Sequence, residues 1–196
     1  MRVIKKDEQI YLAGPFFNPP QKDAAELIAN LCVSHCQKYF SPLLSGGGPL
    51  KSPEHAAEVF ASNVREIRRS KVVLAQLEWL MPPNREIRVV GISSMVKIPP
   101  TLESPPLNIP DSGTVWEVGY AACLRDSSQL ETFVNGAPRF EKTPLVIAYT
   151  TAPQSKLNLM LARSCDAYLN GWDAVHEFIH TGVIPDDART FKGKEQ

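Results

Sequence analysis

The amino-acid sequence predicts an α/β fold built on a mostly parallel β-sheet. Short apolar runs alternate along the chain with segments whose apolar residues recur at helical spacing. The clearest run is apolar almost throughout, which is typical of a parallel strand covered on both faces. With 196 residues, 43% of them hydrophobic, the chain is expected to form a single domain over residues 1–196.

The first half of the chain reads as strand, loop, helix, connection and helix. The strand "QIYLAG" ends at Gly14 and Pro15, which begin the loop "PFFNPPQ". An apolar stripe predicts a helix over residues 22–39. The glycine- and proline-rich stretch 41–53 then connects to a second predicted helix over residues 54–70.

The second half continues the alternation around an irregular stretch. "KVVLAQL" (71–77) is predicted to be a buried parallel strand, a helix is expected from about Thr114, and "PLVIAY" (144–149) is a further strand. Residues 78–110 are rich in proline and have little periodicity, so we expect an insertion over the site. The polar tail at about 185–196 is expected to be loosely held.

Composition favours a small-molecule partner. The formal net charge is zero, which gives no electrostatic footprint for a nucleic-acid polymer. No apolar run is long enough to cross a membrane and the N-terminus turns polar early, so we expect a cytoplasmic protein. The four cysteines have no second ligand pair at zinc-binding spacing, so buried thiols are favoured over a metal site.

A binding site is expected at the carboxyl ends of the parallel strands, where loops and helix N-termini converge. Three segments meet this description: "AGPFFNP", "LEWLMPP" and "DSGTVWE". The chain lacks the GxGxxG and GxxxxGK[ST] phosphate loops and the GxSxG nucleophile motif. A nucleoside-triphosphatase and a serine hydrolase are therefore disfavoured.

Glu117 has two readings from local spacing. Thr114 and Glu117 form the pattern of a capping box, in which each side chain accepts from the other residue's backbone amide. Alternatively, the positive end of the helix keeps the carboxylate ionised for nucleophilic attack. On the second reading we expect the carboxylate to point into a pocket beside Asp111, with Thr114 capping the helix without it.

Three stretches in this order resemble the nucleoside 2-deoxyribosyltransferase family: "YLAGPFF", "DSGTVWEVGYA" and "KLNLML". The resemblance spans residues 10 to about 178 and is most specific in its middle stretch. It implies a flavodoxin-like open sheet with helices on both faces. It also implies a homo-oligomer and no metal or organic cofactor.

Carried over to this sequence, the resemblance implies three catalytic residues. Glu117 matches the nucleophile that attacks the anomeric carbon of a 2'-deoxynucleoside and holds the sugar as an ester. Asp111 matches an aspartate that recognises or protonates the base, and Tyr11 matches a tyrosine that positions the nucleophile. Asn158 matches an asparagine that reaches into a neighbouring subunit's site, and the other substrate-binding candidates are Gly14, Phe16, Phe17, Asn63, Gly113, Trp116 and Met160.

These residue types suit cleavage of an N-glycosidic bond. An anion beneath the sugar stabilises an oxocarbenium-like transition state, and an acid near the base protonates the leaving group. Each partner also has a structural alternative: Tyr11 as a strand aromatic, Asp111 as a turn residue, and Asn158 as a helix cap. The aromatic candidates either stack on a base or pack in the core. The arginine-rich stretch 65–71 reads as a solvated helix face in preference to a phosphate clamp.

The chain departs from the family pattern at Asn63, which stands where many members have an aspartate, and in the long 78–110 insertion. It also runs on through "KGKEQ", so the active-site carboxylate at the C-terminus of some members is not carried over. The leading prediction is a transferase of 2-deoxyribose between bases. The alternatives are a hydrolase of deoxynucleoside 5'-monophosphates using the same site and a non-catalytic nucleotide-sensing module.

Overall fold

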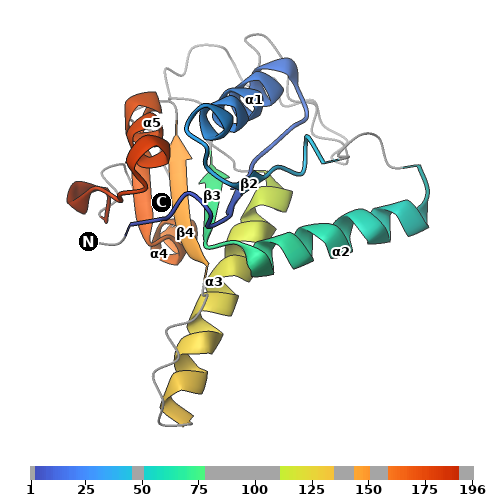
Figure 1. Cartoon of the computed structure of the whole chain (residues 1–196). Coiled ribbons are helices and arrows are strands. Elements are labelled where there is room, and N and C mark those ends of the chain that lie inside the picture. Colours follow the sequence, from blue (N-terminus) through green and yellow to red (C-terminus); the bar gives the residue numbers. More distant parts are fainter. Residues whose placement is uncertain (1–2, 46–50, 78–110, 135–143, 151–158, 190–196) are drawn as a thin grey trace, which may run out of the picture.

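The computed structural model describes residues 3–45, 51–77, 111–134, 144–150 and 159–189, and its core is an open sheet of five parallel strands (Figure 1). The strands lie in the order β2-β1-β3-β4-β5, and every pairing between them is parallel. This is the order of flavodoxin-like folds, so the predicted fold class is confirmed. The strands are β1 (Ile10–Ala13), β2 (Tyr39–Phe40), β3 (Val72–Gln76), β4 (Leu145–Thr150) and β5 (Ala167–Asn170).

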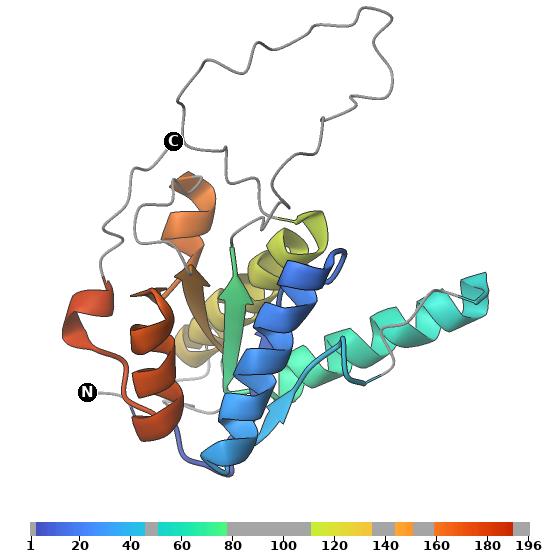
Figure 2. The ribbon, with the colours of Figure 1, turned by 90° about the horizontal axis from the view of Figure 1, so that it is seen from above.

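Helices cover both faces of the sheet (Figures 1 and 2). One apolar cluster joins the sheet to α1 and α5, and a second joins it to α3, α4 and the end of α2. Because side chains alternate along a strand, Ile10 and Leu12 of β1 enter the first cluster while Tyr11 and Ala13 enter the second. The helices are α1 (Pro19–Ser34), α2 (Pro53–Arg69), α3 (Ser112–Val134), α4 (Leu159–Ser164) and α5 (Trp172–Thr181), followed by the 3-10 turn η1 (Asp186–Arg189).

The first predicted helix is wrong at both ends. Asn18 caps α1 in a capping box with Gln21, and prolines occupy the first helical positions, where a missing N–H costs nothing. The helix ends at Ser34, and Cys36 then adopts a positive φ of 55°. The chain can therefore turn back into β2 where helix was expected to continue.

Two segments were expected to be irregular, residues 78–110 and the tail from about residue 185, and the structure describes only part of the second. Residues 78–110 lie outside the described part of the chain. The tail expected to be loose from about residue 185 begins instead with η1, where Ala188 is only 6% exposed and belongs to the α1/α5-side core. Among the described helices, none is long and apolar enough to cross a membrane.

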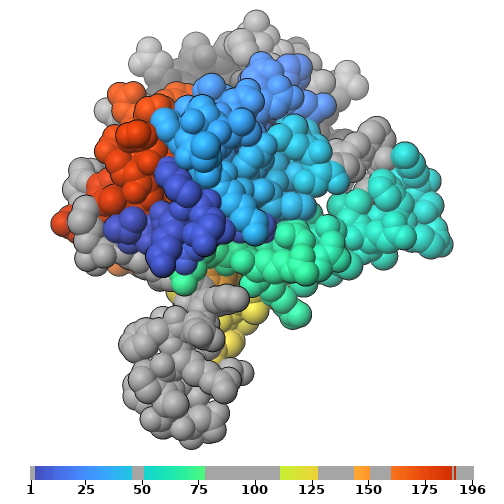
Figure 3. Space-filling view, viewed as in Figure 1, coloured from blue at the N-terminus to red at the C-terminus, as the bar shows by residue number. Residues whose placement is uncertain are grey.

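Helix α2 stands out from the rest of the molecule (Figures 1 and 3). Of its 17 residues only Ile67, near its C-terminal end, is buried. Phe60, further out along the helix, is 56% exposed. The apolar side chains on the outer part of α2 are therefore not buried against the rest of the described chain.

Candidate active site

The carboxyl ends of the strands meet the N-terminal ends of α1 and α3. In Figure 2 both helix ends lie at the end of the sheet toward which the β3 arrow points. The loop from Gly14 to Asn18 follows β1 directly and leads into α1. Parallel strands followed by helices necessarily bring such segments to one edge, so the predicted location of the site agrees with the topology.

Glu117 is held by Tyr11. The Tyr11 hydroxyl donates to Oε1 of Glu117 over 2.5 Å, joining β1 to the second turn of α3. Tyr11 is fully buried, and its ring stacks on Phe40 of β2 with centroids 5.6 Å apart. Because neighbouring strands fix the tyrosine ring, its hydroxyl fixes one oxygen of the carboxylate.

Burial dominates the electrostatics of Glu117. Loss of solvent raises the pKa of its carboxyl, the Tyr11 hydrogen bond lowers it, and the negative charge of Asp111 raises it, with a net pKa of about 7 against an ordinary 4.5. The positive end of the helix was expected to keep Glu117 ionised, whereas this pKa leaves the carboxyl only partly ionised at neutral pH. The pKa of Tyr11 is also raised, by burial first and then by Glu117, so Tyr11 remains a neutral donor.

Asp111 caps helix α3. Its Oδ2 accepts from the backbone N–H of Thr114 at 2.8 Å and from the Thr114 hydroxyl at 3.2 Å. Thr114 is thus the third residue of the helix and not its cap, so the capping box of Thr114 and Glu117 is wrong, and so is the expectation that Thr114 caps the helix without Glu117. The related expectation, that the Glu117 carboxylate is not committed to the Thr114 amide, agrees with its bond to Tyr11.

Gly113 allows the Asp111 cap to close. A Cβ built on Gly113 would lie 2.9 Å from Oδ2 of Asp111, closer than real Cβ contacts. The glycine therefore lets the aspartate reach the Thr114 amide without displacement. This gives the glycine of "DSG" a structural reason independent of any ligand.

The remaining candidates lie in several environments. Gly14 is buried, Phe16 and Asn63 are partly buried, and Phe17 is 68% exposed on the loop after β1. Met160, on α4, is 73% exposed, and Asn158 lies outside the described residues. Among the described candidates, a hydrogen bond thus joins Tyr11 to Glu117 and the charge of Asp111 acts on Glu117, whereas Phe17, Trp116 and Met160 are exposed.

Trp116 faces away from Glu117. Adjacent residues of a helix point about 100° apart, and the Trp116 ring stacks on Tyr120 at 5.1 Å and meets Phe60 of α2 at 5.2 Å. Trp116 is 42% exposed. Its neighbours place it between α2 and α3, so a role in stacking on a base is not supported by its contacts.

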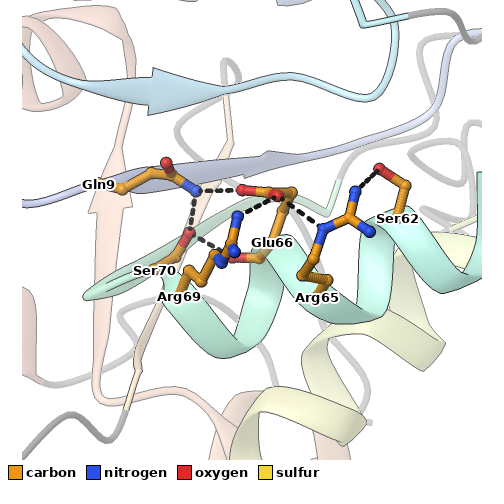
Figure 4. Close-up of polar contacts among 6 residues, drawn as sticks. All are labelled: Gln9, Ser62, Arg65, Glu66, Arg69 and Ser70. Atoms are coloured by element: carbon orange, nitrogen blue, oxygen red, sulfur yellow. Dashed lines mark hydrogen bonds and ion pairs between the residues drawn. The ribbon is translucent and has the colours of Figure 1, made fainter.

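The arginines near the end of α2 are largely exposed, as predicted for a solvated helix face, with the Arg65 and Arg69 side chains 55% and 66% exposed, and they also contact protein groups. Arg65 and Arg69 approach Glu66 at 3.2 and 3.3 Å, and Glu66 also accepts from Gln9, just before β1 (Figure 4). Arg68 donates to the Tyr120 hydroxyl at 2.6 Å. The network joins α2 to the start of the sheet.

Two glutamines at the site were not predicted. Gln21 and Gln76 have side chains that are 0% and 1% exposed, and both lie at the carboxyl edge of the sheet. Each could have been found from the sequence. Gln21 comes three residues after Asn18, which is the spacing of a capping box, and Gln76 is a polar residue near the end of an apolar strand. Among the described residues, no group of three or more His, Cys, Asp or Glu side chains is arranged to hold a metal ion.

The chain is similar in sequence to one protein family over part of its length. The family model described as "Nucleoside 2-deoxyribosyltransferase" matches residues 10–85, which include Tyr11, Gly14 and Asn63 and end before Asp111 and Glu117. No curated protein matches the chain in sequence.

Two solved structures are similar. A 2-deoxyribosyltransferase from Bacillus psychrosaccharolyticus has a TM-score of 0.51 and 20% identity, covering 86% of this chain and 90% of that chain. One from Leishmania mexicana has a TM-score of 0.47 and 21% identity, covering 88% and 97%. The first supports the fold. The family model confirms that the chain resembles the nucleoside 2-deoxyribosyltransferase family, as its motifs predict.

Proposed function

We propose that the protein is a nucleoside 2-deoxyribosyltransferase in which Glu117 is the nucleophile. The observation that carries this proposal is the hydrogen bond from buried Tyr11 to Glu117 at the carboxyl edge of the sheet. The bond leaves the second carboxylate oxygen, Oε2, for attack while it fixes the direction of the group. A carboxylate with a pKa of about 7 is ionised in part at neutral pH and is weakly solvated, which suits a nucleophile.

The reaction proceeds in two displacements. Oε2 of Glu117 attacks the anomeric carbon of a 2'-deoxynucleoside, and the electron pair of the breaking C–N bond leaves with the base, which takes up a proton. We assign interaction with that base to Asp111, and its support is that the negative charge of Asp111 acts on Glu117. A second base then attacks the same carbon, displaces the glutamate and loses a proton, so the configuration is retained.

Assembly into a homo-oligomer is part of the proposal. The resemblance assigns Asn158 to the site of a neighbouring subunit, and the outer half of α2 has an apolar face that the chain itself leaves exposed. An isolated amphipathic helix gains most of its stability from packing that face. A second copy that covers α2 would therefore bury the apolar face of this helix and would also bring Asn158 to the neighbouring site.

Product analysis with and without an acceptor base tests the function. The wild-type protein is incubated with a 2'-deoxynucleoside or its 5'-monophosphate, and products are separated by chromatography. A new nucleoside formed only when base is added supports transfer, whereas free sugar and base formed without it indicate the hydrolase. Absence of turnover on either substrate refutes both enzymatic functions and leaves the nucleotide-sensing module.

Variants assign the reaction to the site. Glu117→Ala is expected to lose turnover, while Glu58→Gln, on the exposed surface of α2, is expected to keep it. Mass spectrometry of the wild-type protein after rapid quenching should show the added mass of one deoxyribosyl group. If Glu117→Ala turns over at the wild-type rate, the assignment of the nucleophile is wrong whatever the product.

A further inference from the structure

Three of the four histidines of the chain form a cluster where α1 and α5 end. His35 is the C-cap residue of α1, and His176 and His180 are four residues apart on α5. The ring centroid of His35 lies 5.1 Å from that of His176 and 4.7 Å from that of His180. Helices in a parallel sheet of this kind run back against the strands, so the cluster lies at the end of the sheet opposite to Glu117. It has no part in the proposed reaction.

The ring of His35 has a nitrogen contact on each side. Its Nε2 lies 3.4 Å from Nε2 of His176, and its Nδ1 lies 3.1 Å from Nδ1 of His180. Each contact is a hydrogen bond only when one of the two nitrogens carries a proton and the other has a free lone pair. His35 therefore bridges two turns of α5 only in certain protonation states.

The two contacts limit the charge that the closed cluster can carry. Each contact accommodates one proton, and the two outer nitrogens, Nδ1 of His176 and Nε2 of His180, can carry one each. Three neutral rings already carry one proton each. The closed cluster therefore has room for a single extra proton, because any further one sets N–H against N–H and breaks a contact.

The groups around the cluster also oppose protonation. Lys6, in the segment before β1, donates from Nζ to the carbonyl oxygens of Ile179 and His180 at 2.8 Å each. A protonated His180 would otherwise be stabilised by these carbonyls at the C-terminal end of α5. Loss of solvent, followed by the charges of His180, His176 and Lys6, lowers the pKa of His35. Positive charge thus faces His35 from α5 and from the N-terminal segment.

We propose that His35, His176 and His180 form a pH-sensitive latch, which holds the end of α1 on α5 at neutral pH and releases it in mildly acidic solution. Free imidazoles have a pKa of about 6.5 and can all be protonated once the latch is open. The open form therefore binds up to two protons more than the closed form. Its population should rise as the pH falls below about 6.5, about tenfold per pH unit for each additional proton bound. The latch goes beyond the proposed function and does not depend on it.

Hydrogen exchange of the full chain at about pH 7.5 and about pH 5.5 tests the latch. The reporters are the backbone amides of Cys36 and Gln37, which donate to the carbonyls of Val33 and Cys32 at the end of α1. Their protection factors, corrected for the pH dependence of exchange itself, are expected to fall about tenfold or more in the wild type. His35→Gln removes the bridging ring and keeps a polar side chain, so its protection should be similar at both pH values.

The fourth histidine supplies the matched control. His55 is in the first turn of α2, outside the cluster, so His55→Gln should lose protection at the end of α1 as the wild type does. Amides of β3, at the centre of the sheet, should keep their protection in all three proteins. Equal wild-type protection at both pH values, or the same fall in His35→Gln as in the wild type, overturns the latch. An equal loss in β3 would reveal global unfolding and overturn it as well.

Discussion

At the scale of single residues, the reactivity of Glu117 is set by opposing effects on one carboxyl group. Burial raises its pKa most, the hydroxyl of Tyr11 lowers it, and the charge of Asp111 raises it, to give a value of about 7. The ionised, attacking form is therefore the one that the surroundings disfavour. Activity in the free enzyme should rise with pH through the neutral range as Glu117 loses its proton.

Tyr11→Phe is predicted to shift this rise to higher pH. The variant removes the hydroxyl that lowers the pKa of Glu117 and keeps the ring that stacks on Phe40. The acidic limb of the kcat/KM profile should therefore move above that of the wild type. Tyr168→Phe, at another buried tyrosine on the same sheet face, is the matched control. A Tyr11→Phe limb at the wild-type position would contradict the role given to the hydrogen bond.

Glu117→Gln is predicted to stabilise the fold at alkaline pH. The folded-state pKa of about 7 lies above the ordinary 4.5, so the native state binds the extra proton and wild-type stability falls as pH rises from 4.5 to about 7. The full difference corresponds to about 3 kcal/mol, which partial exposure reduces. Glutamine keeps an acceptor for Tyr11 and carries no charge.

Denaturant titrations at about pH 5 and pH 8 measure this effect. The free energy of unfolding of Glu117→Gln relative to wild type should be larger at pH 8 than at pH 5. An equal difference at both pH values would show that the Glu117 carboxyl has an ordinary pKa in the native state.

At the scale of elements, the N-terminus of α3 couples helix capping to the active site. Asp111 satisfies the Thr114 amide, and its negative charge also raises the pKa of Glu117. The same carboxylate is thus a structural cap and an electrostatic neighbour. Substitutions can separate these roles because asparagine caps a helix about as well as aspartate but has no charge.

Asp111→Asn is predicted to keep the cap and lower the pKa of Glu117. Its stability should stay within about 0.5 kcal/mol of wild type, whereas Asp111→Ala should lose about 1 kcal/mol with the cap. The acidic limb of the pH profile should move to lower pH in Asp111→Asn, opposite to Tyr11→Phe. A large fall in kcat for Asp111→Asn would additionally identify Asp111 as the proton donor to the base.

Elements with strong local signals were predictable. Strands β1, β3 and β4 are apolar runs that remain buried. Strand β2 has only two residues, which is too short for a periodic pattern in the sequence. It forms because Tyr39 pairs with Ile10 of β1. The cap of α3 was missed because Asp111 to Thr114 and Thr114 to Glu117 offer the same spacing. The choice between them depends on Tyr11, 106 residues away from Glu117.

At the scale of the whole molecule, an aromatic surface remains between two helices. Phe60 of α2 and Trp116 of α3 are 56% and 42% exposed, and their rings lie 5.2 Å apart. Beside them is a groove of about 450 Å³ lined by residues of α2. Large aromatic side chains are enriched at the centres of protein interfaces. This surface is therefore where the proposed second copy is expected to bind.

Phe60→Ser is predicted to weaken the oligomer and its activity together. The change removes a large apolar side chain from the exposed face of α2, while its effect on a single folded chain should be small because Phe60 is mostly exposed. Leu44→Ser, at another exposed apolar residue in the loop after β2, is the matched control. Light scattering after gel filtration measures subunit number, and activity per subunit is followed on dilution. Since Asn158 is assigned to a neighbour's site, dissociation should remove activity in parallel. A Phe60→Ser monomer with full activity would show that one chain contains a complete site.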